Sequence, residues 1–238
     1  LGATASVSSP AANSRLTSLS TRRPPWWSMA RPLNGPSRAD TPSARLNPSH
    51  TSVVDSRTGK NIFSGPKGVE TEAFTHFIGG MQKHLGAAVA LFAPYVNSYR
   101  RYVPDFAAPI NLEWGRDNRT TGIRVPISSA AARRVENRLP GMDTNPYLGI
   151  AATLACGYLG LMNKVAPRPE FSGNAYIDSD EIPTTLGDAL DMLEEDAALV
   201  EVMGPDFCKV YDSVKRNEYK EFLQVISPWE REHLLLNV

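Results

Sequence analysis

The sequence has few cysteines, no long apolar run and no net charge. Two cysteines, Cys156 and Cys208, are too few for a disulfide framework, so a reducing, cytoplasmic location is expected. The longest uncharged apolar stretch, from Leu148 to Met162, is too short to span a bilayer. Because the chain begins at Leu1 without a signal peptide, its natural N-terminus is expected to lie elsewhere. The balance of 25 basic and 25 acidic residues predicts no nucleic-acid partner, and the shortness of the apolar stretch predicts no membrane partner.

The neutral total hides two unlike segments. Residues 1–50 carry six Arg and one acidic residue, Asp40, which gives them a formal charge of +5 and leaves −5 for the remainder. Their ten Ser and seven Pro, with almost no hydrophobic periodicity, cannot bury enough apolar surface to offset chain entropy. We therefore predict that residues 1–48 are low-complexity and disordered. A basic arm for nucleic acid and a misread gene segment are the alternatives.

The remainder of the chain, residues 49–238, has the periodicity of a folded domain. Apolar residues at helical spacing predict a helix over 70–92, and a nearly all-apolar stretch predicts a buried helix over 146–164. Residues 108–114 and 120–126 look like strands joined by a polar turn. These patterns are followed by further predicted elements: a strand at 133–138, a helix capped by Thr185, and helices over 206–225 and after Ser227.

Arginine is concentrated between residues 97 and 147. Because strand side chains alternate, Arg134, Glu136 and Arg138 of the predicted 133–138 strand should point to the same side. Arginine keeps its charge in proteins, so this cluster predicts phosphate or carboxylate ligands held by bidentate hydrogen bonds. Glu136 is alternatively a divalent-metal ligand, and the whole cluster is alternatively an ion-pair ladder on a solvated sheet face.

Several long segments of the sequence resemble the catalytic domain of the glutamine synthetase family. The segments that carry the resemblance are SHTSVVDSRTGKNIFSG (49–65), NSYRRYVPDFAAP (97–109), NLEWGRDNRTTGIRVP (111–126), ARRVENRLPGMDTNPYLGIAATLACGYLG (132–160) and FLQVISPWEREHLLLNV (222–238). Within the family, GRDNRTTGIRVP and WEREHLLLNV look most like gamma-glutamylputrescine synthetases. The resemblance implies an α+β fold, with an antiparallel sheet packed by helices, that corresponds to the C-terminal part of the catalytic domain.

The resemblance also implies a reaction and a set of site residues. ATP would phosphorylate the side-chain carboxylate of glutamate, and an amine, putrescine-like or ammonia, would attack the resulting gamma-glutamyl phosphate. ATP and Mg²⁺ (or Mn²⁺) are the implied cofactors, and a ring-shaped homo-oligomer is the implied assembly. The implied roles are a catalytic role for Arg119, ATP binding by His50, Ser52, Arg119, Arg124 and Arg134, glutamate binding by Arg101 and Arg138, and metal binding by Glu136.

Three departures from the family pattern bear on this assignment. A metal-ligating His is replaced by Pro48, a flap glutamate by Ala107, and a lysine near the ATP by Ala131. Loss of the flap carboxylate favours a larger amine than ammonia. The family's upstream acidic metal ligands have no counterpart in residues 1–50, and Glu136 alone cannot hold a catalytic magnesium pair. The alternative function is therefore an inactive fragment that at most binds nucleotide or glutamate, or associates with intact subunits.

Overall fold

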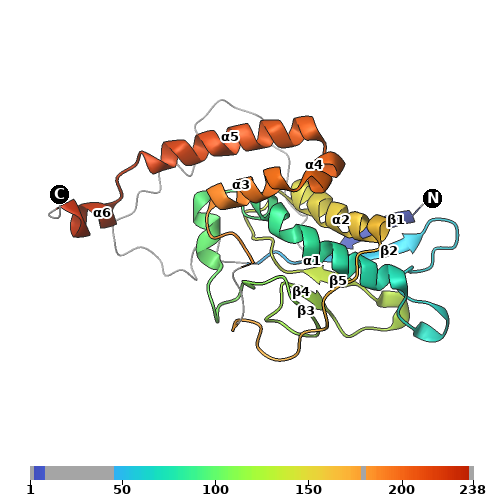
Figure 1. Ribbon diagram of the computed structural model, residues 1–238. Coiled ribbons are helices and arrows are strands. Elements are labelled where there is room, and N and C mark those ends of the chain that lie inside the picture. Colours follow the sequence, from blue (N-terminus) through green and yellow to red (C-terminus); the bar gives the residue numbers. More distant parts are fainter. Residues whose placement is uncertain (1–2, 9–45, 178–180, 236–238) are drawn as a thin grey trace, which may run out of the picture.

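The computed structural model describes residues 3–8, 46–177 and 181–235. These residues form an α+β fold in which helices cover one side of a single sheet (Figure 1). This confirms the predicted fold class. The disorder predicted for residues 1–48 concerns mostly residues outside the described ranges, but it differs from the structure at Ala3–Ser8, which form a strand paired with residues 50–55.

The sheet has five strands in the order β1-β2-β5-β4-β3. Their bounds are β1 Ala3–Ser8, β2 Ser49–Asp55, β3 Trp114–Arg116, β4 Ile123–Val125 and β5 Val135–Asn137. β2 pairs antiparallel with both β1 and β5, and β5 pairs antiparallel with β4. The predicted strand at 133–138 is therefore present, at the centre of the sheet.

The sheet is mixed, and it differs from the predicted antiparallel sheet at one pair of strands. β3 and β4 pair parallel, with Trp114 opposite Ile123. The strand predicted over 108–114 starts only at Trp114, because Asn111 bends the preceding backbone: its Oδ1 accepts from the amides of Glu113 and Gly122. The chain then returns through a tight loop in which Asp117 has a positive φ of 48°.

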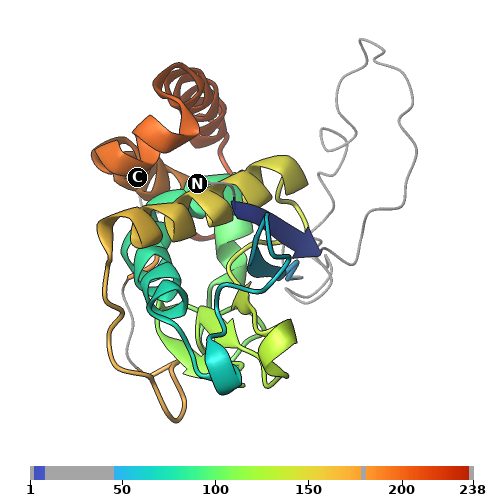
Figure 2. The ribbon, with the colours of Figure 1, turned by 90° about the vertical axis from the view of Figure 1, so that its right-hand side faces the viewer.

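Two long helices, α1 (Glu72–Phe92) and α2 (Pro146–Asn163), pack on the sheet and on each other (Figures 1 and 2). Thr71 caps α1 by accepting from the amide of Phe74, and the buried face of α1 supplies much of the core. Beneath it, the ring of Phe63 contacts Phe74 and Phe77 at centroid distances of 5.7 and 5.2 Å. The helix predicted over 70–92 is thus confirmed.

The second long helix is only partly buried, unlike its prediction. Asn145 caps α2, and its inner side packs on α1, but Tyr147, Tyr158 and Met162 remain exposed. Although α2 has apolar residues on every side, only its inner side, which packs on α1, is buried. No helix in the described ranges is long and apolar enough to cross a membrane.

Four shorter or outer helices follow along the chain. They are α3 (Leu186–Glu195), α4 (Ala197–Met203), α5 (Pro205–Leu223) and α6 (Pro228–His233). Thr185 and Ser227 cap α3 and α6 as predicted, whereas α4 was not predicted. α4 and α5 lie on the side of α1–α3 that faces away from the sheet (Figure 2).

Candidate active site

The register of three neighbouring strands places three predicted site residues in one row. His50 of β2 lies opposite Glu136 of β5, and Glu136 lies opposite Arg124 of β4. Directly opposed residues of antiparallel strands project to the same face of a sheet. The row therefore joins a histidine, a carboxylate and a guanidinium across the centre of the sheet.

This row lies on the face of the sheet that is turned away from the helices. The neighbouring Asn137 points the other way, where its amide donates to Thr153 of α2 at 3.0 Å. Because side chains alternate along a strand, Arg134 and Arg138 flank Glu136 on its own side. The sequence prediction that these three residues share a face is consistent with the observed strand.

Glu136 is the buried centre of the row, with a residue exposure of 4%. Its Oε2 accepts from Nη1 of Arg124 at 2.7 Å, and its Oε1 lies 3.8 Å from Nε of Arg138. Two guanidinium groups thus flank the carboxylate, but they belong to Arg124 and Arg138 and not to Arg134.

The two flanking arginines differ in their electrostatic surroundings. Burial disfavours the charge of Arg124, but hydrogen bonds to Asp117 and Glu136 outweigh burial and raise its pKa. Burial lowers the pKa of Arg138 despite the nearby charge of Glu136. Both groups remain cationic at neutral pH, since arginine is not deprotonated in proteins.

Asp117 is a site residue that the sequence interpretation missed. Its carboxylate accepts from Nη2 of Arg124, whose Nη1 binds Glu136, so one guanidinium joins two acidic side chains. The available signal was that Asp117 is the single acidic residue between Arg116 and Arg124. Its charge partner depends on the parallel pairing of β3 and β4, which the sequence pattern does not indicate.

The surroundings of His50 disfavour its charged form. Burial lowers its pKa, and the positive charges of Arg134 and Arg124 lower it further, against the opposing effect of Glu136. Its Nδ1 is buried and finds no hydrogen-bond partner within the part of the chain that the structure describes. Ser52 follows two residues later on β2, and therefore on the same face.

The other predicted phosphate-binding arginines lie at the edge of the row. Arg119 is exposed on the loop before β4, and its carbonyl accepts from Nη1 of Arg138. Arg134 is half-buried, and its Nη1 donates to the carbonyl of Ala132 at 3.2 Å. Arg134 thus lies beside Glu136, and Arg119 lies beside Arg138. Both side chains are accessible to an anionic ligand.

Arg101 differs from the other predicted site residues because its side chain is enclosed, with an exposure of 1%. It lies at the end of the 3-10 segment Val96–Arg101, and Nη1 faces Asp143 Oδ1 at 3.3 Å. Its further acceptors are the carbonyls of Ser98, Phe92 and Leu139 and the hydroxyl of Tyr102. The structure therefore gives Arg101 internal partners and does not place it in the row.

A magnesium site does not fit the side chains of the row. Among residues 46–177 and 181–235, no three His, Cys, Asp or Glu side chains are grouped closely enough to hold a metal. The carboxylate of Glu136 is already engaged by two guanidinium groups, which repel a cation. Glu136 is thus a single candidate ligand in a positively charged setting.

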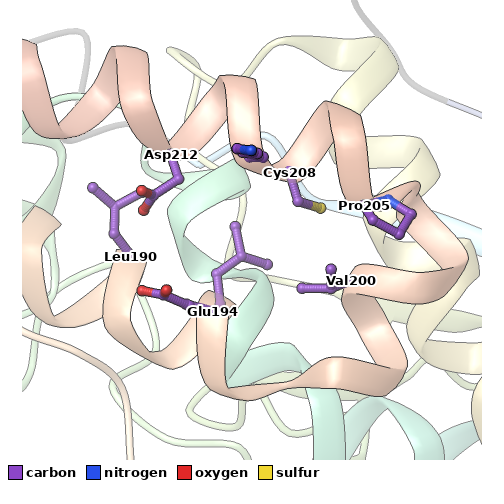
Figure 3. Close-up of a pocket in the computed structure, with 8 residues that line it drawn as sticks. Leu190, Glu194, Val200, Pro205, Cys208 and Asp212 are labelled. Atoms are coloured by element: carbon purple, nitrogen blue, oxygen red, sulfur yellow. The ribbon is translucent and has the colours of Figure 1, made fainter.

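A separate small pocket lies away from this row, between α3, α4 and α5 (Figure 3). It has a volume of about 190 Å³. Its lining residues are Leu190, Leu193, Glu194, Val200, Pro205, Cys208, Lys209 and Asp212. None of the predicted site residues contributes to it.

Comparisons with known proteins identify the family. Residues 46–234 match the family model for the catalytic domain of glutamine synthetase. The match covers well over half of the chain, so this protein belongs to the glutamine synthetase family.

Individual relatives include ligases with two different names. The chain is 37% identical over 197 residues to the glutamine synthetase of Pyrococcus abyssi, covering 79% of this chain and 44% of the relative. It is 35% identical over 190 residues to the gamma-glutamylputrescine synthetase PuuA of Escherichia coli K12, covering 79% and 40%. The chain therefore spans less than half the length of these curated relatives.

A solved structure supports the same fold. The structure titled "Apo GmaS without ligand" superposes with a TM-score of 0.71 at 29% sequence identity. The match covers 80% of this chain and 45% of that chain. The fold is accordingly a partial glutamine synthetase catalytic domain.

Proposed function

We propose that this chain carries the phosphate- and glutamate-binding part of an ATP-dependent ligase that joins the gamma-carboxylate of glutamate to an amine through a gamma-glutamyl phosphate. The observation that carries the proposal is the row of His50, Glu136 and Arg124, extended by Arg134 and Arg138 on the helix-free face. Family membership supports the reaction class.

The charge of this face suits the proposed chemistry. Arg119, Arg124, Arg134 and Arg138 outnumber the two acidic partners, Asp117 and Glu136, and therefore leave an excess of positive charge. Phosphoryl transfer between anions depends mainly on positioning and on charge stabilisation. We propose that Arg119, Arg124 and Arg134, with His50 and Ser52, bind ATP phosphates or nucleotide, and that Arg138 binds the glutamate carboxylate. Arg101, which has internal partners, would stabilise the segments next to the site and would not contact the ligand directly.

We propose a putrescine-like polyamine as the amine, with ammonia as the alternative. Ala107 stands where ammonia-using members of the family have a carboxylate, and a small apolar residue leaves room for an alkyl amine. The similarity to the gamma-glutamylputrescine synthetase of Escherichia coli supports this choice.

A catalytically inactive fragment remains the second candidate. It is favoured by the single carboxylate of the row, Glu136, which does not fit a magnesium site by itself. Such a fragment would bind nucleotide or glutamate, or associate with intact subunits that supply the other ligands.

One experiment separates the two candidates. The purified chain is incubated with ATP, Mg²⁺ and glutamate, with putrescine or ammonium added separately, and ADP release is measured. Amine-dependent release at about 1 s⁻¹ or faster, which is typical of enzymes, supports the ligase. Nucleotide binding without amine-dependent ADP release supports the inactive fragment.

The proposed catalytic role of Arg119 can be tested with a matched arginine control. Arg119→Ala should abolish turnover while the thermal unfolding midpoint stays unchanged, because this side chain is exposed. Arg57→Ala, also exposed but on the turn after β2, should leave both quantities unchanged. Unfolding of Arg119→Ala would instead indicate a structural role.

We also propose that the protein forms a homo-oligomer in the cytoplasm. Leu234 and Leu235 at the end of α6 are 45% and 66% exposed, so they are not buried in the core formed by the described residues. A neighbouring subunit would cover them. Light scattering of the native protein would show the assembly, and a concentration-independent monomer mass would contradict it.

A further inference from the structure

The loop of residues 103–109 lies against Arg138 and is held at two consecutive carbonyls. The carbonyl of Ala107 accepts from Nη2 of Arg138 at 3.4 Å. The preceding carbonyl, of Phe106, accepts from the hydroxyl of Tyr176. With the loop in this position, Arg138 has a residue exposure of only 8%.

Tyr176 is itself firmly placed. The preceding residue, Ala175, is 1% exposed; its amide donates to Thr120 Oγ1 at 2.9 Å, and its carbonyl accepts from Asn111 Nδ2 at 2.9 Å. The amide of Tyr176 donates to Asn174 Oδ1 at 3.1 Å. The phenol therefore extends from a backbone segment that is anchored to the loops around β3 and β4.

The phenol is a permanent hydrogen-bond donor at neutral pH. Burial raises the pKa of Tyr176, and the nearby carboxylate of Asp105 raises it further, against the opposing charge of Arg138. Asp105 also shapes the loop, since its φ of 56° reverses the chain just before Phe106. Arg138 and Tyr176 thus hold the loop at two adjacent residues, Ala107 and Phe106.

The two contacts differ in what a ligand would do to them. A substrate carboxylate forms charge-assisted bonds to a guanidinium, which are stronger than the long bond from Arg138 to the neutral carbonyl of Ala107. Such a ligand would displace the Ala107 carbonyl. The bond between Tyr176 and Phe106 does not involve Arg138 and would survive this exchange.

We propose that Tyr176 is a positioning residue of this site, whose hydroxyl holds the 103–109 loop over Arg138 and so controls the access of a carboxylate to that guanidinium. The identity of the carboxylate as glutamate rests on the proposed function, whereas the control of access does not.

The proposal predicts that Tyr176→Phe exposes Arg138. In the 238-residue chain, the rate at which phenylglyoxal modifies Arg138 is measured by peptide mass spectrometry, with exposed Arg57 as the internal reference. Loss of one hydrogen bond predicts about a fivefold faster reaction at Arg138 and an unchanged rate at Arg57. Hydrogen–deuterium exchange of residues 103–109 should also become faster.

A second tyrosine provides the matched control. Tyr158→Phe makes the same chemical change on α2, where the residue is 49% exposed and lies beside Val202 and Met203 of α4, so it should change neither rate. Equal modification rates of Arg138 in the wild type and in Tyr176→Phe would overturn the proposal. Faster modification and exchange in Tyr158→Phe as well would show that the effect is not specific to Tyr176 and would also overturn it.

L-Glutamate separates this inference from the proposed function. Protection of wild-type Arg138 by millimolar L-glutamate, together with faster modification in Tyr176→Phe, supports both. Faster modification in the variant without glutamate protection supports the role of Tyr176 but counts against glutamate as the ligand. Glutamate protection with equal rates in the two chains supports the ligand and refutes the role of Tyr176.

Discussion

The helical layer has a very close backbone contact at the crossing of α1 and α2, where Gly80 meets Gly160. A Cβ atom added to Gly80 would overlap the carbonyl of Cys156 and the backbone of Gly160, well inside the 3.0 Å that real Cβ atoms keep. The obstructing atoms are backbone atoms, so no side-chain rotation can relieve the overlap. We therefore expect Gly80→Ala to force the two helices apart.

The size of the effect follows from two opposing contributions. Alanine in a helix interior is about 1 kcal/mol more favourable than glycine. Overpacking of a well-packed core typically costs about 1–3 kcal/mol, and a backbone–backbone overlap belongs at or above the top of that range. The net loss should be about 2 kcal/mol, which corresponds to a fall of roughly 4–8 °C in the unfolding midpoint of a domain of this size.

A second glycine of the same helix gives the matched control. A Cβ on Gly86 would approach the flexible end of Met192 at 3.0 Å, and such an atom can move aside. Gly86→Ala should therefore be neutral or stabilising by up to about 1 kcal/mol. Both variants are compared by urea and thermal unfolding, and a midpoint for Gly80→Ala equal to or above that of Gly86→Ala would refute the close helix crossing.

Three further predictions concern charges and a helix cap. Glu136→Ala should lower the free energy of unfolding by about 3 kcal/mol in urea titrations, because it leaves Arg124 and Arg138 without their buried counter-charge. Glu136→Gln should lower the free energy of unfolding by less. Equal stability of Glu136→Ala and wild type would contradict the buried ion pairs of Glu136. Burial works against the charge of Asp196, but hydrogen bonds from His84 and from the amide of Leu199 outweigh it, and its pKa lies below the usual 3.8. The folded state therefore binds this proton less readily than the unfolded state. The stabilisation is present above about pH 4 and is lost as the pH falls below it. In Asp196→Asn, the free energy of unfolding should depend less on pH in this acidic range. Thr185→Ala removes the acceptor for the amide of Asp188 and should cost about 1 kcal/mol in the same titration, whereas Thr185→Ser should not.

Most of the helices, though not α4, were predictable from the sequence because their signals are local. Caps such as Thr71, Thr185 and Ser227 accept from amides only three residues away, and an amphipathic stripe can be recognised without knowing which element packs against it. The exposure of α2 was not predictable in this way. Which side of a helix without charged residues stays uncovered depends on how its neighbours are placed, and composition contains no information on that.

The sheet and the site show the same limit. That Arg134, Glu136 and Arg138 share a face follows from the two-residue period of a strand, which the sequence pattern alone indicates. The partners of Glu136 across the sheet depend on the register of β2 and β4, which is a non-local property. For the same reason, the sequence did not indicate that Asp117 binds Arg124 or that Tyr176 binds the loop over Arg138. Both contacts depend on the three-dimensional arrangement of the chain.

The hydrogen bonds within the site also determine what a ligand must do to bind there. Arg124 is shared by two carboxylates, and Arg138 donates to the carbonyls of Arg119, Thr121 and Ala107. An incoming phosphate or carboxylate must therefore replace existing bonds, and it will do so where the present acceptor is neutral or distant. This favours Arg138, whose acceptors are mainly carbonyls, over Arg124, whose acceptors are charged. A cation has the opposite requirement, because it needs carboxylates that are free of arginine. We therefore expect this face to bind anions by itself. It should bind a divalent metal only when another polypeptide segment supplies carboxylates.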